Sequence, residues 1–552
     1  MASVVADVRR VGEGALLIEA ARPDAVAAIA AELRVRADAA GWRVADVVPA
    51  AKTVLVDGIA GGDVDTVARA LGAWEVVPLP EGAGPLVELP VVFDGDDLDD
   101  VASLWSVTAG DVVEQVTALE LRVAFCGFAP GFGYLTGLPS DRAVPRHATP
   151  RTRVPAGAFG LAGPYAGVYP RASPGGWRLL GRLADHAPVL WDPARDSPAL
   201  LTPGTRVRVV DAGERARVRR AQDSDAPRTP SPSRSGGGGA GLSPSEGGAR
   251  ARAAAGLRIE RSGALATVQD LGRPGFAHLG VPRSGAADAG AHRRANALVG
   301  NEPDAATIEA TATGCAVRAL SDLVVAVAGA RCPVWVGDVP APFGSPVRLR
   351  AGQTVELGST ESGLRSYLAV RGGIRAEPVL GSRATDVLSG LGPDPLRDGD
   401  ELAVGAAAPL DDAAFASLRA LAGGARDGGR REGRTVELTL VPGPRADWFT
   451  AGAHESLTDA DYTVTGESNR VGVRFDGPTL ERATTDELAS EGVVLGAVQV
   501  PPSGLPVVFL ADHPTTGGYP VIGVLDTDSV ARAAQLRPGD RVRFRPIADE
   551  PR

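Results

Sequence analysis

Hydrophobic and polar positions follow two different periods in the first 85 residues. ALLIEA (15–20) and TVLVDG (53–58) are short runs rich in aliphatic residues, which predicts strands. The segments 24–39 and 64–72 repeat apolar residues every three to four positions, which predicts amphipathic helices. Residues 1–85 are therefore expected to form a small α/β domain.

The pattern changes within residues 86–212. VELPVVF (87–93) predicts a strand, DLDDVASLW a short helix, and Thr108 with Asp111 a capping box that opens a helix ending near Leu119. Beyond Leu121 the helical period fades, and short β segments alternate with Gly- and Pro-containing turns up to about residue 211. Many short strands at close spacing predict a β-barrel.

Residues 213–256 contain RTPSPSRSGGGGAGLSPSEGG. A segment of this composition buries too little apolar surface to become ordered, so it predicts a flexible linker. The linker resembles a joint between two proteins that could exist separately.

The second half returns to β patterns. Residues 257–407 are mostly strand-like and contain one Ala-rich helix, 286–299, which Gly300 caps. Residues 408–434 form a connecting segment, and 435–552 form a last β-rich block. The predicted fold class is therefore mainly β, with an N-terminal α/β domain and tandem β-barrels at 86–212, 257–407 and 435–552.

A repeat supports the tandem barrels. GGWRLLG (175–181) is followed by PGTRVRV (203–209), and GGYPVIG (517–523) is followed by PGDRVRF (538–544). RAGQTVELG (350–358) and RDGDELAVG (397–405) echo the closing strand of each pair. The shared unit is a glycine turn that leads into a strand of alternating apolar and polar residues.

Composition excludes several classes of function. The formal net charge of −10 argues against a nucleic-acid-binding role. No apolar run reaches the roughly 18 residues of a membrane span, and the N-terminus lacks a signal-peptide pattern, so we expect a cytoplasmic protein with no membrane partner. Lysine occurs once, at Lys52, without a preceding P-loop or a biotin-acceptor context. The three cysteines and the histidines show no metal-site spacing.

Two ordered sets of motifs resemble a known family. FCGFAPGFGYLTGLP (125–139), RHATPRTRVPAG (146–157) and GVYPRASPGGW (167–177) closely resemble the B subunit of 5-oxoprolinase, which is also called allophanate hydrolase subunit 1. Four later segments resemble its partner, the C subunit: ATVQDLGRPGFAHLGVPRSGAADAGAHRRANALVGN (266–301), NRVGVRFDGPTL (469–480), GAVQVPPSGLPVVFLAD (496–512) and TTGGYP (515–520). Together they cover nearly all of the chain outside the linker, as in B and C subunits fused into one polypeptide.

The resemblance implies cyclophilin-like barrels and ATP-dependent cleavage of 5-oxoproline to glutamate, together with a separate protein, the A subunit of 5-oxoprolinase. It implies ATP and Mg²⁺ as cofactors and a small-molecule substrate, with no biotin on this chain. Relatives leave two alternatives open. One is a non-catalytic histidine-kinase regulator of the sporulation-inhibitor type. The other is an accessory protein of urea carboxylase or the allophanate pathway, related to urea amidolyase and the biotin-dependent carboxyltransferases. A homo-oligomer also stays open. The family commonly has His, Tyr and Gln where this chain has Val116, Leu121 and Tyr165.

The stretch 125–139 holds four glycines, two prolines and four aromatic rings in fifteen positions. Glycines let a backbone approach a ligand, prolines limit the entropy lost on ordering, and rings offer apolar faces. The stretch therefore predicts a site wall formed by Gly127, Phe128, Pro130, Gly131, Phe132 and Tyr134. The alternative interpretation is a packing turn at a barrel entrance.

Arginine must supply the cations of a phosphate or carboxylate site, because no lysine is suitably placed. Arg151 and Arg153 share one face of an extended segment and are predicted catalytic residues; a solvated strand face is the alternative. Pro155 follows them. Gly175, Gly176 and Trp177 form a turn whose backbone could hold an anion, or a simple barrel corner.

The second half adds further candidates. Asp270 and Asp512 are predicted catalytic residues, and Asp512 ends an apolar strand where side chains reach a barrel mouth, although a turn-initiating Asp fits equally. Glu309 could face a barrel interior, where a carboxylate is costly unless paired or used. The remaining predicted substrate- or ATP-binding residues are Gln269, Arg273, Asp288, Gln499, His513, Thr515, Thr516, Gly517 and Tyr519. Metal ligands are not assigned.

Overall fold

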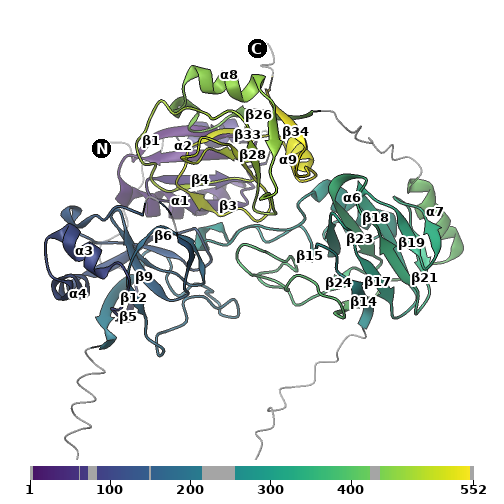
Figure 1. Ribbon diagram of the computed structural model, residues 1–552, viewed down its shortest axis with the longest axis horizontal. Helices are drawn as coiled ribbons and strands as arrows, with labels where there is room; N and C mark the ends of the chain where they lie inside the picture. Colours follow the sequence, from purple (N-terminus) through teal and green to yellow (C-terminus); the bar gives the residue numbers. More distant parts are fainter. Residues whose placement is uncertain are drawn as a thin grey trace, which may run out of the picture.

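The computed structural model describes residues 4–60, 63–71, 84–147, 149, 151–213, 255–408, 410–422 and 435–547. Four units follow one another along the chain, and the last one lies between the second and the third (Figure 1). Most of the predicted linker, 213–256, falls outside the described residues.

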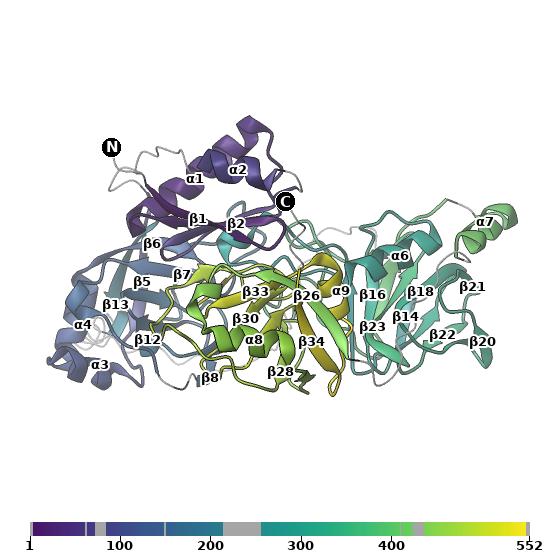
Figure 2. The ribbon, with the colours of Figure 1, turned by 90° about the horizontal axis from the view of Figure 1, so that it is seen from above.

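The N-terminal unit is an antiparallel sheet of order β1-β2-β4-β3 with two helices. Its elements are β1 (Val5–Val11), β2 (Ala15–Ala20), α1 (Val26–Ala40), β3 (Asp46–Pro49), β4 (Thr53–Asp57) and α2 (Val64–Leu71). Both faces of the sheet are buried. Leu16 and Ile18 pack toward the helices, whereas Leu17 and Leu55 pack against the C-terminal unit (Figure 2). This explains why ALLIEA is apolar at successive positions instead of alternating.

The second unit is a closed seven-stranded barrel of order β10-β7-β6-β13-β5-β12-β9. Its strands are β5 (Leu86–Val92), β6 (Glu120–Cys126), β7 (Gly133–Thr136), β9 (Ala158–Ala162), β10 (Tyr165–Val168), β12 (Arg178–Leu183) and β13 (Arg206–Asp211), with a side ribbon of β8 (Arg151–Val154) and β11 (Ser173–Gly175). Helices α3 (Leu98–Trp105) and α4 (Ala109–Ala118) pack onto its core. The capping box is confirmed, since Thr108 Oγ1 accepts from the Asp111 N–H at 3.2 Å and the Asp111 carboxylate accepts from the Thr108 N–H at 2.9 Å.

The third unit differs from the closed barrel predicted for 257–407. Its described strands form two sheets, of order β20-β19-β22-β17-β14-β25-β24 and β15-β16-β23-β18-β21. The strands are β14 (Ala255–Arg261), β15 (Leu265–Gln269), β16 (Thr307–Thr311), β17 (Ala316–Ala319), β18 (Leu323–Arg331), β19 (Val334–Val336), β20 (Val339–Ala341), β21 (Val347–Leu349), β22 (Thr354–Leu357), β23 (Ser362–Val370), β24 (Ile374–Arg375) and β25 (Glu401–Val404). One hydrophobic core lies between the two sheets. Helix α6 (Ala289–Val299) packs on β18 and β23 and ends at Gly300, which has the predicted capping conformation at φ 69°, and α7 (Asp412–Ala422) follows.

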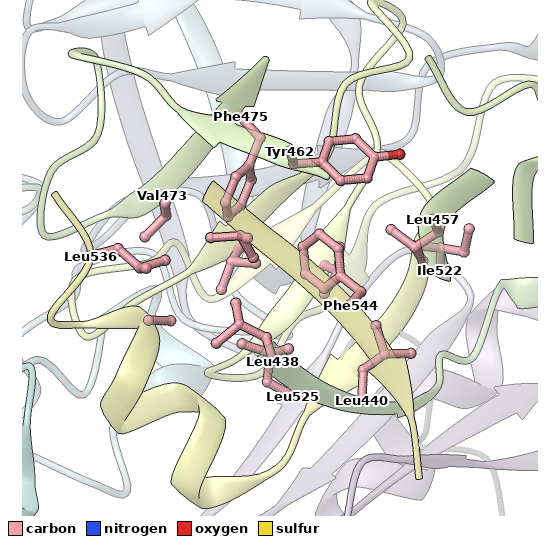
Figure 3. Packing of buried hydrophobic residues seen from close by; sticks show 14 of the residues in the cluster. Leu438, Leu440, Leu457, Tyr462, Val473, Phe475, Ile522, Leu525, Leu536 and Phe544 are labelled. Carbon is pink, nitrogen blue, oxygen red and sulfur yellow. The ribbon is translucent and has the colours of Figure 1, made fainter. Parts of the chain in front are cut away.

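The C-terminal unit is a second closed seven-stranded barrel, of order β26-β33-β30-β31-β28-β27-β34. Its elements are β26 (Val436–Pro442), α8 (Ala451–Asp459), β27 (Tyr462–Val464), β28 (Gly472–Asp476), β30 (Ala497–Gln499), β31 (Val507–Phe509), β33 (Val521–Leu525), α9 (Thr527–Ala533) and β34 (Arg541–Pro546), with a ribbon of β29 (Glu491–Gly492) and β32 (Thr516–Gly517). The rings of Tyr462, Phe475 and Phe544 pack edge to face at its centre, with centroids 5.6–6.4 Å apart (Figure 3).

The two closed barrels confirm the tandem-barrel fold class and the sequence repeat. In each, the first strand pairs in parallel with the last, β5 with β13 and β26 with β34. The repeated segments are β12 with β13 in one barrel and β33 with β34 in the other. In the third unit β14 instead pairs antiparallel with β25. The segment of β25 that resembles the closing strands of the barrels therefore belongs to a different topology.

A buried ion-pair network joins the third unit to the C-terminal barrel. The guanidinium of Arg470 bonds Asp512 Oδ2 at 2.9 Å and Glu309 Oε1 at 2.5 Å, and Arg470, Asp512 and Glu309 are at most 1% exposed. Burial works to raise the pKa of Glu309, but the charges of Arg470 and Arg365 hold it below its ordinary value. Glu309 is therefore a paired carboxylate, and the pairing offsets the free-energy cost of burying its charge.

Replacing Arg470 with Met should lower the free energy of unfolding by about 3–5 kcal/mol, because Asp512 would stay buried without its cation and Glu309 would keep only Arg365, whose Nε lies 3.5 Å away. Urea denaturation followed by circular dichroism measures this. Arg474→Met is the matched control, since Arg474 lies in the following strand β28 and is exposed. Equal midpoints for the two variants would contradict the bridging role of Arg470.

Candidate functional site

A pocket of about 320 Å³ lies between the two closed barrels. Its lining comes from both halves of the chain: Phe128, Phe132, Tyr134, Arg146, His147, Tyr169, Pro174, Gly175, Gly176 and Trp177 from the first barrel, and Ser490, Gln499, Pro514, Thr516, Gly517, Gly518 and Tyr519 from the second. The volume lies at the small end of the range for ligand pockets.

A short backbone contact joins the two barrels beside this pocket. The N–H of Phe128 donates to Thr516 Oγ1 at 3.0 Å, and a Cβ on Gly127 would collide with the Thr516 side chain. Phe128 has φ 64°, a left-handed conformation that costs a non-glycine residue about 1–3 kcal/mol. FCGFAPGFGYLTGLP and TTGGYP, remote in sequence, thus form one junction.

Aromatic rings make the floor of the pocket. Phe132 lies edge to face with Tyr134, Tyr169 and Trp177 at centroid distances of 5.0–5.2 Å. Burial raises the pKa of Tyr134, against the opposing effects of the Arg146 charge and hydrogen bonds to Ser490 and Thr516. Its phenol therefore stays protonated at neutral pH and can donate a hydrogen bond.

Asp97 organises the charged groups on one side of the floor. Its carboxylate accepts two 2.8 Å hydrogen bonds from Arg151 Nη2, one from the Leu179 N–H at 2.6 Å, and one contact of 3.0 Å from His147 Nε2. Burial works to raise the pKa of Asp97, but the hydrogen bonds from Arg151, Leu179 and His147 lower it below its ordinary value. Asp97 thus fixes the ring of His147 at the pocket wall.

Arg151 and Arg153, the cations predicted from sequence, do not line the pocket. Arg151 is held by Asp97, and its Nη1 donates to the Trp177 carbonyl at 3.2 Å. Arg153 is exposed on β8. The cation that the pocket does present is Arg146, which lies at the start of RHATPRTRVPAG and is absent from the residues that the sequence predicts.

Other predicted residues of the first half lie in or beside the pocket. Phe128, Tyr134, Gly175, Gly176 and Trp177 line it. The loop residues Gly127, Pro130 and Gly131 are placed just behind: Gly131 has φ 76° and its N–H donates to the Leu279 carbonyl at 3.0 Å, and Pro130 is buried. Pro155 is exposed at the turn before β9.

The predicted residues of the second half do not all gather at the pocket. Gln499, Thr516, Gly517 and Tyr519 line the pocket. His513 and Thr515 line a separate cavity of about 40 Å³ that also touches Asp46, Asp57 and Arg283. Asp512 and Glu309 belong to the Arg470 network, and Asp288 caps α6 by accepting from the Ala291 N–H at 2.9 Å.

Asp270, Gln269 and Arg273 form a buried cluster with the turn at 382–385. Asp270 accepts from Ser382 Oγ and from the Arg383 N–H, both at 2.6 Å. Gln269 donates to the Thr385 carbonyl at 2.9 Å, and Arg273 donates to the Ala384 carbonyl. These partners give the cluster a role in holding that turn, and none of the three residues lines the pocket.

The positions that depart from the family pattern lie outside the pocket lining. Val116 and Leu121 are fully buried in the core of the first barrel. Tyr165 packs edge to face on Tyr134 at 5.6 Å, behind the floor, and burial raises its pKa to about 12. Among the lining residues, sequence reasoning misses Arg146, His147, Tyr169, Pro174, Ser490, Pro514 and Gly518. Most of them lie inside motifs that it does single out.

Across the described ranges, no group of three or more His, Cys, Asp or Glu side chains is arranged to hold a metal ion. No described helix has the length and apolar character needed to cross a bilayer.

Comparisons with known proteins agree with the two-part architecture. Residues 6–201 match the family model "Carboxyltransferase domain, subdomain C and D", and residues 279–546 match "Carboxyltransferase domain, subdomain A and B". The C subunit of 5-oxoprolinase from Escherichia coli (strain K12) is 36% identical over 291 residues, which are 52% of this chain and 90% of that protein. The chain belongs to the carboxyltransferase-domain family.

The other relatives complete this assignment. The B subunit of 5-oxoprolinase from Escherichia coli O157:H7 is 44% identical over 153 residues, 27% of this chain and 69% of that protein. The crystal structure of TTHA0988 is 32% identical with a TM-score of 0.77, covering 98% of this chain and all of that one. Urea amidolyase of Lachancea kluyveri is 31% identical over 314 residues, 52% of this chain but 16% of that protein. The chain thus joins a part similar to the B subunit to a part similar to the C subunit.

Replacing Asp97 with Asn should lower the free energy of unfolding by about 1.5–3 kcal/mol, because the charge-assisted hydrogen bonds from Arg151 to the buried carboxylate would be lost. The matched control is Asp100→Asn, whose ion pair with Arg178 is 61% exposed at the Asp100 side chain and should matter by about 0–1 kcal/mol. Chemical denaturation of both variants measures the difference. A small, equal loss in the two would show that Asp97 does not organise this side of the pocket.

Proposed function

We propose that the chain is the fused B and C component of an ATP-dependent 5-oxoprolinase, which converts 5-oxoproline to glutamate together with a separate protein that resembles the A subunit of that enzyme. The observation that carries the proposal is that the pocket is lined jointly by the motifs of the B-like and C-like parts. The relatives named as B and C subunits of 5-oxoprolinase support it.

The pocket has the properties that a small lactam requires. Its aromatic floor offers apolar faces to a five-membered ring, and Tyr134 can donate to an amide oxygen. Arg146 and His147 lie on the adjoining wall. These groups bind and orient the ring and exclude water from one of its faces.

A metal–nucleotide complex does not fit the pocket as well as the lactam does. The described lining residues include no carboxylate, and the small volume suits a single ring better than a nucleoside triphosphate. The requirement for ATP stays a prediction, to be tested by leaving it out.

The urea amidolyase relative supports urea as a rival substrate. A urea carboxylase-type role would require a biotin carrier on another protein, because Lys52 is the single lysine and lacks an acceptor context. Urea and 5-oxoproline can be compared directly in one assay.

The reconstituted enzyme should form glutamate from 5-oxoproline when the chain, its A-type partner, ATP and Mg²⁺ are all present, and it should not consume ATP with urea. Glutamate is measured by a coupled dehydrogenase assay. Omitting ATP should abolish the product. Absence of glutamate from the complete mixture, or ATP consumption that depends on urea instead, would contradict the proposal.

Gly127→Ala should reduce glutamate formation at least about tenfold, because a Cβ at this position collides with Thr516 at the junction of the two barrels. Gly452→Ala is the matched control, since a Cβ there, on α8, meets no atom within 4 Å. Both variants are first checked for folding by circular dichroism. A folded Gly127→Ala protein with full activity would place the reaction away from this junction.

A further inference from the structure

The charges around the pocket are unbalanced. Of the described residues that line it, Arg146 alone carries a permanent charge, and Asp, Glu and Lys are absent from that lining. His147 is already engaged by Asp97 through Nε2. The pocket is therefore electropositive, although the whole chain has a net charge of −10.

Arg146 is available to a ligand, unlike the other arginines nearby. Its ion pair with Glu487 is long, at 3.5 Å, and both side chains are solvent-accessible, 38% and 71% exposed. Such a pair contributes about 0–1 kcal/mol and exchanges readily for a better anion. Arg151, by contrast, is held by both oxygens of a buried carboxylate.

The guanidinium of Arg146 lines the same pocket as the aromatic floor. Its Nη1 lies 3.6 Å from where a Cβ on Gly518 would be, so it reaches the loop of the second barrel. Its positive charge acts on the phenols of Tyr134, Tyr165 and Tyr169, opposing the rise in pKa that burial causes at each. A ring lying on the floor would present its substituents to this cation.

We propose that Arg146 binds the carboxylate of a small cyclic amide whose ring packs on the Phe132–Tyr134–Trp177 floor. The choice of a lactam rests on the proposed function; the anion site itself rests on the charge and geometry of the pocket. Arginine suits the role because its planar fork can bond both carboxylate oxygens. Arg146 is then the residue that selects 5-oxoproline over an uncharged lactam.

Isothermal titration calorimetry of the full chain, without its A-type partner, tests the proposal. The probes are 5-oxoproline, 2-pyrrolidinone, which is the same ring without the carboxylate, and ATP with Mg²⁺. The wild-type chain should bind 5-oxoproline about 10- to 100-fold more tightly than 2-pyrrolidinone, the range for one charge-assisted hydrogen-bonded contact. Arg146→Gln should remove that preference, and Arg146→Lys should restore part of it.

Two controls separate this effect from a general loss of charge. Arg182→Gln removes an exposed arginine that pairs with Asp94 at 3.1 Å on the same barrel and does not line the pocket, so it should leave binding unchanged. Glu487→Gln removes the competing carboxylate and should keep or strengthen 5-oxoproline binding. The proposal would be overturned if the wild-type chain failed to bind 5-oxoproline or bound both lactams equally well. It would also be overturned if Arg146→Gln weakened the binding of ATP alone, because Arg146 would then bind a phosphate.

The experiments can separate a failure of the carboxylate site from a failure of the proposed 5-oxoprolinase function. Binding of 5-oxoproline that depends on Arg146, with no glutamate in the reconstituted assay, would keep the carboxylate site and reject the 5-oxoprolinase reaction. Glutamate formation by Arg146→Gln with an unchanged KM for 5-oxoproline would keep the 5-oxoprolinase reaction and reject the carboxylate site at Arg146.

Discussion

The buried guanidinium of Arg470 is the contact on which the arrangement of the second half depends. It lies between Asp512 of the C-terminal barrel and Glu309 of the two-sheet unit, and it also donates to the Gly285 carbonyl at 2.6 Å. Asp512 accepts further bonds from Ser284 Oγ at 2.6 Å and from the Val387 N–H at 3.0 Å. Burying three charged groups costs free energy that only well-formed hydrogen bonds offset, so one relative position of the two units satisfies them all. The segment that follows Asp512 runs directly into the pocket.

The second constraint is the junction between the barrels, where a glycine faces a threonine. Gly127 leaves room for the Thr516 side chain. Phe128 adopts a strained left-handed backbone conformation, and its N–H donates to Thr516 Oγ1. Neither barrel alone supplies more than part of the pocket lining. A site of this kind needs both parts held together, which a single polypeptide achieves through a high effective concentration. The fused architecture and the shared pocket therefore have one physical explanation.

Sequence reasoning predicts the two closed barrels because alternation and glycine turns repeat at GGWRLLG and GGYPVIG, and those patterns follow directly from strand geometry. It misses the open two-sheet unit because closure depends on whether the edge strands of a sheet pair with one another, and alternation is the same in either case. At the site, the motifs that contain Phe128, Trp177 and Thr516 can be found from sequence, since glycine and aromatic clusters are rare. The partner of Arg151 cannot, because Asp97 lies 54 positions earlier in a turn of unremarkable composition.

The same pairing explains why the pocket is positive in an acidic protein. Buried carboxylates near the pocket are each matched to an arginine: Asp97 to Arg151, Asp512 to Arg470, and Glu491 to Arg445, whose Nε lies 3.1 Å from Glu491 Oε2. Most of the described Asp and Glu side chains are instead at least partly exposed, where water screens their charge. What remains at the pocket is Arg146, with a weak exposed partner and an aromatic floor opposite. Sequestering the other charges lets one arginine determine which small anions the site accepts.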